Sequence, residues 1–333
     1  MLRLSSYEYH RPTELGEALE LLARYGEDAL PIAGGTDLMP NMKHGLFTPG
    51  HLVGLKGIRE LYGIEQRDGE VAIGACESLT AVSESPIVRR VFPSLAGAAG
   101  DIAHPMIRNQ GTLGGNLCLD TRCTYYNQTH FWRKALGFCL KKDGDVCHVV
   151  KGGTRCVAAH SADTPPVLMT LGASIDVASA NGERTVPVSD FFVADGIWNT
   201  VRERNELVTR VRIPKPSPGL RTSFQKLRER KSVDFPILSV ALAVQLTEDE
   251  TVESISLVVS ALAARPREIG RLNEIARGQE LTTRVIEEVA SQAHRQCHPL
   301  PNLIVDTDWR RAMVPVHVRR AFAEILGCSA AAA

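Results

Sequence analysis

The sequence predicts an α+β protein of two or three domains rather than one doubly wound sheet. The chain has 333 residues, whereas an average domain has roughly 150. It opens with a β-α-β pattern: a strand-like segment at 7–10, helically spaced Ala and Leu ending at Gly26, and an apolar run at 30–33. Near the C-terminus, strands and helices come in separate runs, which is typical of α+β domains.

The later elements follow from the same periodicities. Short strands are expected at 51–55 and 71–74, helical patterns between 79 and 99, and a Gly- and Asn-rich loop at 103–116. Further strands are expected at 174–177, 207–213, 224–227, 238–246 and 251–260, and further helices at 166–171, 281–293 and 309–326.

Composition and charge argue against several function classes. Apolar residues make up 44% of the chain, enough for a full core. Lys and Arg number 38, as do Asp and Glu, and this zero net charge argues against nucleic-acid binding and against attachment to an anionic membrane. The most apolar stretches, 237–246 and 255–264, are about half the ~20 residues of a membrane span. Since no apolar leader is visible, we expect a cytoplasmic protein with reduced thiols.

Two glycine-rich segments are candidate ligand sites. Ala33-Gly-Gly-Thr-Asp37 follows an apolar run, and its glycines allow backbone N–H groups to approach an anion. Asn109-Gln-Gly-Thr-Leu-Gly-Gly-Asn116 adds a hydroxyl and two Asn side chains. Neither segment matches a P-loop or G-x-G-x-x-G. Two such turns suit a pyrophosphate enclosed from two sides; the alternative is a pair of unrelated turns.

Cysteines are concentrated in the middle of the chain. Five of the eight fall between Cys118 and Cys156. Four of these lie inside a segment, 119–160, that has no sustained helix or strand period. We interpret 119–160 as an inserted loop with some short helix, and a loop of this length needs something to organise it. In a reducing compartment, clustered cysteines favour a metal site over disulfides.

Spacing alone leaves three alternatives for this loop. Cys123, Cys139, Cys147 and Cys156 lack the close C-x₂₋₄-C pairs of structural zinc. Four thiolates from a long irregular loop suit a [4Fe–4S] cluster, with one thiolate on each iron. Zinc and unrelated free thiols stay open, and Cys118 is a fifth candidate ligand.

Two charged residues are also candidates. Asp163 precedes a Pro-Pro pair, where capping of a helix is its default role. Lys226 opens a short basic run that is followed by Asp234. Such a run is usually a solvated surface, and the alternative is a lysine placed over a cofactor. No Ser-His-Asp or paired-carboxylate pattern stands out, and no residue of the chain is expected to be catalytic.

Together these segments resemble the FAD-binding medium subunits of the molybdenum hydroxylases, the family of xanthine dehydrogenase and carbon monoxide dehydrogenase. The resemblance rests on Ala33–Asp37, Ile107–Asn116, Asp163-x-x-Pro and the late Lys226 with Asp234. It implies a two-subdomain α/β region that binds FAD (the PCMH type) and a C-terminal antiparallel sheet with helices. The implied domains are residues 1–55, 56–215 (containing the inserted loop 119–160) and 216–333.

The inserted loop departs from the usual pattern of the family. Most members join Gly-Gly-Asn to the Asp by a short connection, whereas Asn116 and Asp163 are 47 positions apart here. The β subunits of 4-hydroxybenzoyl-CoA reductases, which resemble this chain also at Asp120–Asn127, carry an additional [4Fe–4S] cluster in this loop. The resemblance implies that its ligands are Cys123, Cys139, Cys147 and Cys156, leaving Cys118 unligated.

The resemblance also implies the FAD contacts. The two glycine segments would wrap the pyrophosphate and ribityl chain, Asp163 would face the ribityl or isoalloxazine part, and Lys226 would lie near the pyrimidine edge, where a cation stabilises reduced flavin. The implied cofactor-binding set is Ile32, Ala33, Gly34, Gly35, Thr36, Asp37, Ile102, Ala103, Asn109, Thr112, Gly115, Asn116, Asp163 and Lys226.

The implied function is electron transfer within a larger complex. A molybdopterin-containing large subunit and a [2Fe–2S] small subunit would be the partners, in a heterohexamer. Ferredoxin would supply electrons through the [4Fe–4S] cluster and FAD, and 4-hydroxybenzoyl-CoA would be reduced to benzoyl-CoA on the partner. Two alternatives stay open: an oxidative molybdenum hydroxylase or dehydrogenase of another aromatic or purine substrate, and a zinc-stapled binding module without redox function.

Overall fold

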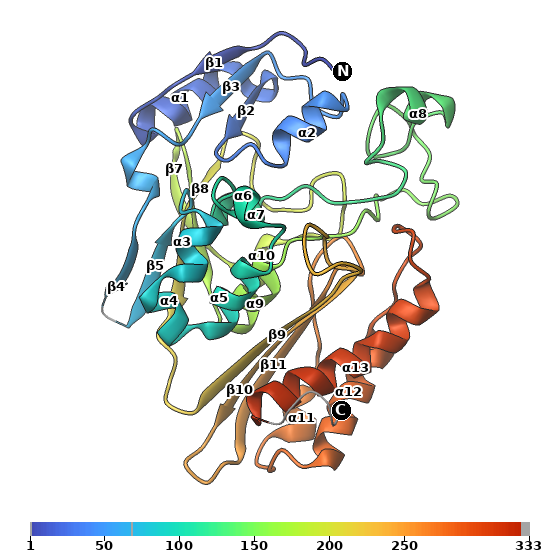
Figure 1. The fold of residues 1–333 in the computed structure, drawn as a ribbon. Helices are drawn as coiled ribbons and strands as arrows, with labels where there is room; N and C mark the ends of the chain where they lie inside the picture. The colour runs from blue at the N-terminus through green and yellow to red at the C-terminus, as the bar shows by residue number, and fades with distance from the viewer. Residues whose placement is uncertain (1, 68, 328–333) are drawn as a thin grey trace.

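The computed structural model describes residues 2–67 and 69–327, which form three sheets in sequence order (Figure 1). The sheets use strands from residues 8–54, 64–214 and 220–268, so the α+β class is confirmed. The expected domain boundaries at 55/56 and 215/216 fall between sheets, and the division itself stays a prediction. Residues 1, 68 and 328–333 lie outside the described part. The last of these ranges is the end of the expected C-terminal domain.

The first sheet is small and parallel. Its order is β1-β3-β2, and its elements are β1 (Glu8–His10), α1 (Leu15–Tyr25), the 3₁₀ turn Gly26–Asp28, β2 (Ala29–Ile32), α2 (Leu38–Lys43) and β3 (His51–Gly54). Ala18 and Leu22, one turn apart on α1, pack with Val53 of β3 in one buried cluster. The predicted β-α-β opening is therefore confirmed, and β2 leads directly into the first glycine segment.

The second sheet is antiparallel, in the order β4-β5-β8-β6-β7. Its strands are β4 (Ile64–Arg67), β5 (Glu70–Gly74), β6 (Ser174–Ser179), β7 (Gly182–Pro187) and β8 (Leu207–Pro214). Its other elements are the 3₁₀ turn Arg59–Leu61, α3 (Leu79–Glu84), α4 (Pro86–Val91), α5 (Pro93–Gly100), α9 (Thr164–Thr170) and α10 (Val188–Phe191). Pro86 and Pro93 stand in first turns, where a helix needs no N–H donor.

The segment 103–116, expected to be loop, contains two short helices. They are α6 (Pro105–Arg108) and α7 (Leu113–Leu117). Local capping explains them: Pro105 begins α6, and the Thr112 hydroxyl accepts a 3.0 Å hydrogen bond from the Gly115 amide at the start of α7. Helices of four or five residues are too short to leave a periodic apolar pattern, so the sequence did not predict them.

The C-terminal sheet is antiparallel and carries its helices as expected. Its order is β12-β11-β10-β9, and its elements are β9 (Leu220–Leu227), β10 (Leu238–Leu246), β11 (Val252–Ser260), β12 (Arg267–Glu268), α11 (Leu272–Ala276), α12 (Thr283–Gln296) and α13 (Thr307–Ile325). Strand β10 is buried on both faces: Val240 and Leu242 join the core under α12 and α13, while Ala241 joins the core that contains α5 and α9. This explains its unbroken apolar run and fixes the C-terminal domain against the second sheet.

The insertion, residues 119–160, extends from the body of the molecule and contains one short helix, α8 (His130–Ala135) (Figure 1). Its two ends meet, because Arg122 and Ala159 exchange backbone hydrogen bonds of 2.8 and 2.6 Å. The C-terminal domain also contacts both ends of the insertion: Asn302 accepts a hydrogen bond from the Thr124 amide (2.9 Å) and donates one to the Val157 carbonyl (2.6 Å). The insertion is therefore fixed at its base from two sides.

No helix within the described residues combines the length and the apolar character that crossing a membrane requires.

Candidate functional site

The two glycine segments lie against each other. A Cβ atom placed on Gly34 would stand 2.1 Å from the carbonyl oxygen of Gln110, and one on Gly111 would stand 3.4 Å from the Thr36 hydroxyl. Gly35 has a φ of +67°, which favours glycine. Since only glycine permits this close approach, the two segments form one surface after β2 and before α7, which is the arrangement that the pyrophosphate alternative requires.

The first segment ends at a charged contact with the insertion. Asp37 accepts a 3.2 Å hydrogen bond from Asn41 and pairs with Arg122. The Arg122 guanidinium also lies 4.6 Å above the ring of Phe235. Burial raises the pKa of Asp37, and the positive charge of Arg122 opposes the rise. Because Arg122 directly precedes Cys123, this pair joins the expected flavin and cluster regions.

Polar side chains of the second glycine segment form hydrogen bonds with other residues of the chain. Thr112 caps α7, and the side-chain oxygen Oδ1 of Asn116 accepts from the backbone amide (3.1 Å) and the hydroxyl (2.7 Å) of Thr164. Asn109 is exposed and accepts from Thr80 at 2.6 Å. Thr112 and Asn116 therefore shape the segment, whereas Asn109 lies at its rim; a direct contact of these side chains with FAD stays a prediction.

Asp163 and Lys226 form a buried ion pair at 2.7 Å, with side chains 4% and 1% exposed. Lys226 also donates to the Asp101 carbonyl at 3.1 Å. Burial raises the pKa of Asp163 to about 6, although Lys226 acts in the opposite direction. The other carboxylate oxygen, Oδ1, is buried without a hydrogen-bond partner. A buried acceptor left open in this way fits a hydroxyl or N–H group of a bound cofactor.

Ile102 and Ala103 lie beside this pair. The Ile102 carbonyl accepts from Arg108 at 2.8 Å, and the Ala103 carbonyl accepts from the Val233 amide at 2.9 Å. Ala103 has a φ of +46°, an unusual backbone conformation for a residue with a side chain. The structure thus places 102–103 between α5 and the loop after β9, next to Lys226.

The four predicted cluster ligands come together. Cys123, Cys139, Cys147 and Cys156 line one small cavity inside the insertion, and Cys118 is outside it. Backbone amides approach two of the sulfur atoms: Val150 N–H to Cys147 Sγ at 3.4 Å and Ala158 N–H to Cys156 Sγ at 3.5 Å. Among the described cysteines none is in a disulfide.

The positions of the sulfur atoms bear on the metal alternatives. Among the residues that the structure describes, no three cysteine sulfurs lie within 4.8 Å of one another. A tetrahedral zinc site with bonds of about 2.3 Å holds its sulfurs roughly 3.8 Å apart. A [4Fe–4S] cluster binds each thiolate through a different iron and so spaces them more widely. Four cysteines that line one cavity fit a metal site in the insertion, and the choice between a [4Fe–4S] cluster and zinc stays a prediction.

Two buried cations attach the insertion to the rest of the chain. Lys141 donates to the carboxylate of Asp120 and to the Gly196 carbonyl (2.7 Å), and lies 4.4 Å above the Tyr126 ring. Arg133 is 1% exposed and donates to the Gly45 carbonyl at 3.1 Å. Sequence reasoning did not distinguish these side chains from solvated ones, because their partners are distant in the sequence. For Arg122, proximity to Cys123 is the one signal that could have found it.

Two family models match most of the chain. The FAD binding domain in molybdopterin dehydrogenase matches residues 5–216, and the CO dehydrogenase flavoprotein C-terminal domain matches residues 222–325. The match boundaries separate the first two sheets from the third.

Individual relatives are similar over nearly their whole length. The carbon monoxide dehydrogenase medium chain of Hydrogenophaga pseudoflava is 32% identical over 317 residues, covering 95% of both chains. The glyceraldehyde dehydrogenase medium chain of Sulfolobus acidocaldarius is 26% identical, covering 96% of this chain and 98% of that one. A solved structure of the Hydrogenophaga carbon monoxide dehydrogenase superimposes with a TM-score of 0.81 at 28% identity, over 98% of this chain and 100% of that one. This chain therefore belongs to the FAD-binding medium subunits of the molybdenum hydroxylase family, and it is an oxidoreductase subunit.

Proposed function

We propose that this chain carries both FAD and a [4Fe–4S] cluster, and that it is the electron-transfer subunit of a 4-hydroxybenzoyl-CoA reductase-like enzyme. The observation that carries the proposal is the convergence of Cys123, Cys139, Cys147 and Cys156 on one cavity of the insertion. When bound, the cluster supplies one-electron exchange and FAD supplies exchange of one or two electrons.

The residues of the chain have distinct parts in this proposal. The glycine segments present backbone N–H groups to the pyrophosphate. Asp163 accepts a hydrogen bond through its open Oδ1 atom, and Lys226 holds a positive charge near the isoalloxazine. Arg122 fixes the base of the insertion to Asp37, which keeps the cysteine cavity at a constant position relative to the glycine segments.

The chemistry is assigned to a partner. We propose a molybdopterin-containing large subunit and a [2Fe–2S] small subunit, assembled as a heterohexamer in the cytoplasm, where thiols stay reduced. Reduced ferredoxin is the proposed electron donor. The substrate, 4-hydroxybenzoyl-CoA, takes up two electrons and two protons and loses its hydroxyl group as water, giving benzoyl-CoA.

Anaerobic purification of the full chain tests the cofactor assignment. We expect one flavin and about four irons per chain, with matching sulfide. Cys139→Ser should remove most of the iron while flavin remains. Cys118→Ser is the matched control, because its thiol lies outside the cavity, and it should keep the iron of the wild type. Unchanged iron in Cys139→Ser would contradict the ligand set.

The direction of electron flow needs the complex. The assembled enzyme, given reduced ferredoxin under anaerobic conditions, should convert 4-hydroxybenzoyl-CoA to benzoyl-CoA. The second candidate is an oxidative hydroxylase or dehydrogenase, favoured by the names of the relatives, which include dehydrogenases of carbon monoxide and glyceraldehyde. It predicts no benzoyl-CoA, and flavin reduction by an aromatic or purine substrate instead. The third candidate, a non-redox zinc module, predicts bound zinc and no flavin in the purified chain.

A further inference from the structure

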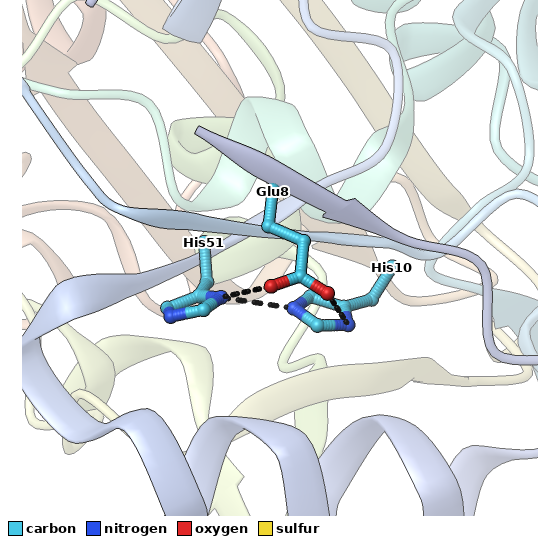
Figure 2. A group of neighbouring side chains, drawn as sticks. All are labelled: Glu8, His10 and His51. Carbon is cyan, nitrogen blue, oxygen red and sulfur yellow. Dashed lines mark hydrogen bonds and ion pairs between the residues drawn. The ribbon is translucent and has the colours of Figure 1, made fainter. Parts of the chain in front are cut away.

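Glu8, His10 and His51, three side chains of metal-ligating type, lie together on the first sheet and share no residue with the expected cofactor sites. Glu8 and His10 are two positions apart on β1, so their side chains point to the same face. Glu8 is in register with His51 on the neighbouring strand β3. Figure 2 shows the carboxylate and the two imidazole rings turned toward one another. The pairing of two parallel strands thus brings together residues 41 and 43 positions apart.

The donor atoms are close enough to share one ion. His10 Nε2 lies 3.0 Å from His51 Nδ1, and the Glu8 carboxylate oxygens lie 3.6 Å from His51 Nδ1 and 3.9 Å from His10 Nδ1. One donor atom from each residue fits within a 4.8 Å limit. A tetrahedral ion with bonds of about 2.0–2.1 Å needs ligands roughly 3.3 Å apart, so small side-chain adjustments suffice.

The surrounding residues hold both rings in place. The Tyr25 ring of α1 stacks on His51 at a centroid distance of 3.6 Å, with 16° between the planes. Just before His51, the Gly50 amide donates to Asp28 at 2.7 Å, while the Gly50 carbonyl accepts from the Glu8 amide at 2.8 Å. The imidazole side chains are 14% and 19% exposed. Their positions are therefore fixed before any ion binds, which lowers the entropy cost of binding.

We propose that Glu8, His10 and His51 bind one divalent transition-metal ion, with Zn²⁺ the best match. Two imidazoles and one carboxylate suit zinc and its neighbours, whereas Mg²⁺ and Ca²⁺ prefer oxygen ligands only. The Glu8 side chain is 66% exposed, so the fourth position opens to water. The ion would join β1, a three-residue edge strand, to β3. This site is independent of the proposed electron-transfer function.

Zinc titration of the purified full chain, followed by calorimetry and thermal unfolding, tests the site. The wild type should bind one Zn²⁺ at this site and melt at a higher temperature with zinc present, because an ion that binds only the folded state stabilises it. Glu8→Gln should weaken binding at least tenfold, and His51→Asn should abolish it. His298→Asn changes an exposed histidine beyond α12 and should bind zinc as the wild type does.

Two further measurements exclude misfolding of the variants and zinc binding by the cysteines as explanations. Circular dichroism confirms that each variant is folded, and Glu8→Gln alters an exposed carboxylate that no core contact requires. Zinc binding to the thiols is separated by Cys139→Ser, which should leave this site intact. Wild-type zinc affinity in folded Glu8→Gln and His51→Asn, or loss of the zinc site in Cys139→Ser alone, would overturn the proposal.

Discussion

Lys226 of β9 reaches Asp163, at the start of α9, through an ion pair of 2.7 Å that is almost completely shielded from water. The two residues belong to the two separately matched regions of the chain, 5–216 and 222–325. One pair of opposite charges therefore joins both regions at the expected flavin site, and the open Oδ1 atom of Asp163 stays fixed in position by its neighbour.

Breaking this pair should destabilise the protein. Lys226→Met leaves a buried carboxylate without its cation, and we expect a loss of about 3–5 kcal/mol in the free energy of unfolding, measured with urea on flavin-free protein. The double variant Asp163→Asn/Lys226→Met should recover much of the loss, because no charge is then buried alone. Lys231→Met, at an exposed position, is the control. Equal stability of the two lysine variants would contradict the prediction.

The glycine contact predicts a second effect. Gly34→Ala would place its methyl group 2.1 Å from a backbone oxygen that cannot move aside, so the two glycine segments must separate. We expect the purified variant to contain far less flavin per chain than the wild type. Gly97→Ala in α5 is the matched control: its new methyl group meets nothing within 4 Å, and it should add about 0.5–1 kcal/mol to stability and keep the flavin. Normal flavin content in Gly34→Ala would be evidence against the site.

The contact between the insertion and the first glycine segment can be tested at Arg122. Arg122→Gln leaves Asp37 without its cation and loosens the base of the insertion. We expect reduced flavin content and faster proteolysis within 119–160. Arg155→Gln removes an exposed arginine of the same insertion and should resemble the wild type in both measurements. Unchanged proteolysis in Arg122→Gln would contradict this prediction and show that the other contacts of the base, such as those of Asn302, are sufficient.

Acid should destabilise the protein through His160. Burial lowers the pKa of His160 to about 3 from 6.5, because removal from water disfavours the charged imidazolium. The ring has a 2.9 Å hydrogen bond with the Ser260 hydroxyl and lies edge-to-face with Phe192. Below about pH 6.5 the unfolded chain binds a proton that the folded chain does not, so stability is full above that pH and falls toward pH 3. Compared with His160→Gln, the wild type should lose up to about 1.4 kcal/mol per pH unit.

Urea unfolding of both proteins at several pH values checks this slope. The difference between the two proteins is the informative quantity, because His317 also has a lowered pKa, about 4, and contributes equally to both. Parallel pH profiles for the wild type and His160→Gln would contradict the assignment.

The sequence predicted the long elements well, because they carry regular apolar patterns. Strand β10, buried on both faces, has an unbroken apolar run, and α1 repeats its apolar residues every turn. The sequence did not predict β7, whose residues are exposed except for Val186, or the four-residue α6. Such elements are set by their neighbours and caps, which a local pattern does not reveal.

The candidate site was predictable where backbone geometry demands a residue type. The sequence alone shows the glycines at 34 and 35. It also shows the four cysteines concentrated in one segment. The pairing of Lys226 with Asp163 was not visible, since the partners are 63 positions apart and either could have been solvated. Their burial follows from the docking of the C-terminal sheet, which depends on the whole fold.

The reciprocal backbone bonds between Arg122 and Ala159 have an evolutionary consequence. A chain that leaves and returns at the same point can gain or lose the intervening stretch without displacing the scaffold that it interrupts. A shortened chain that joins positions 122 and 159 directly would keep the path of the backbone on either side of the insertion, although it would lose the contacts of Lys141 and Arg133 with the rest of the chain.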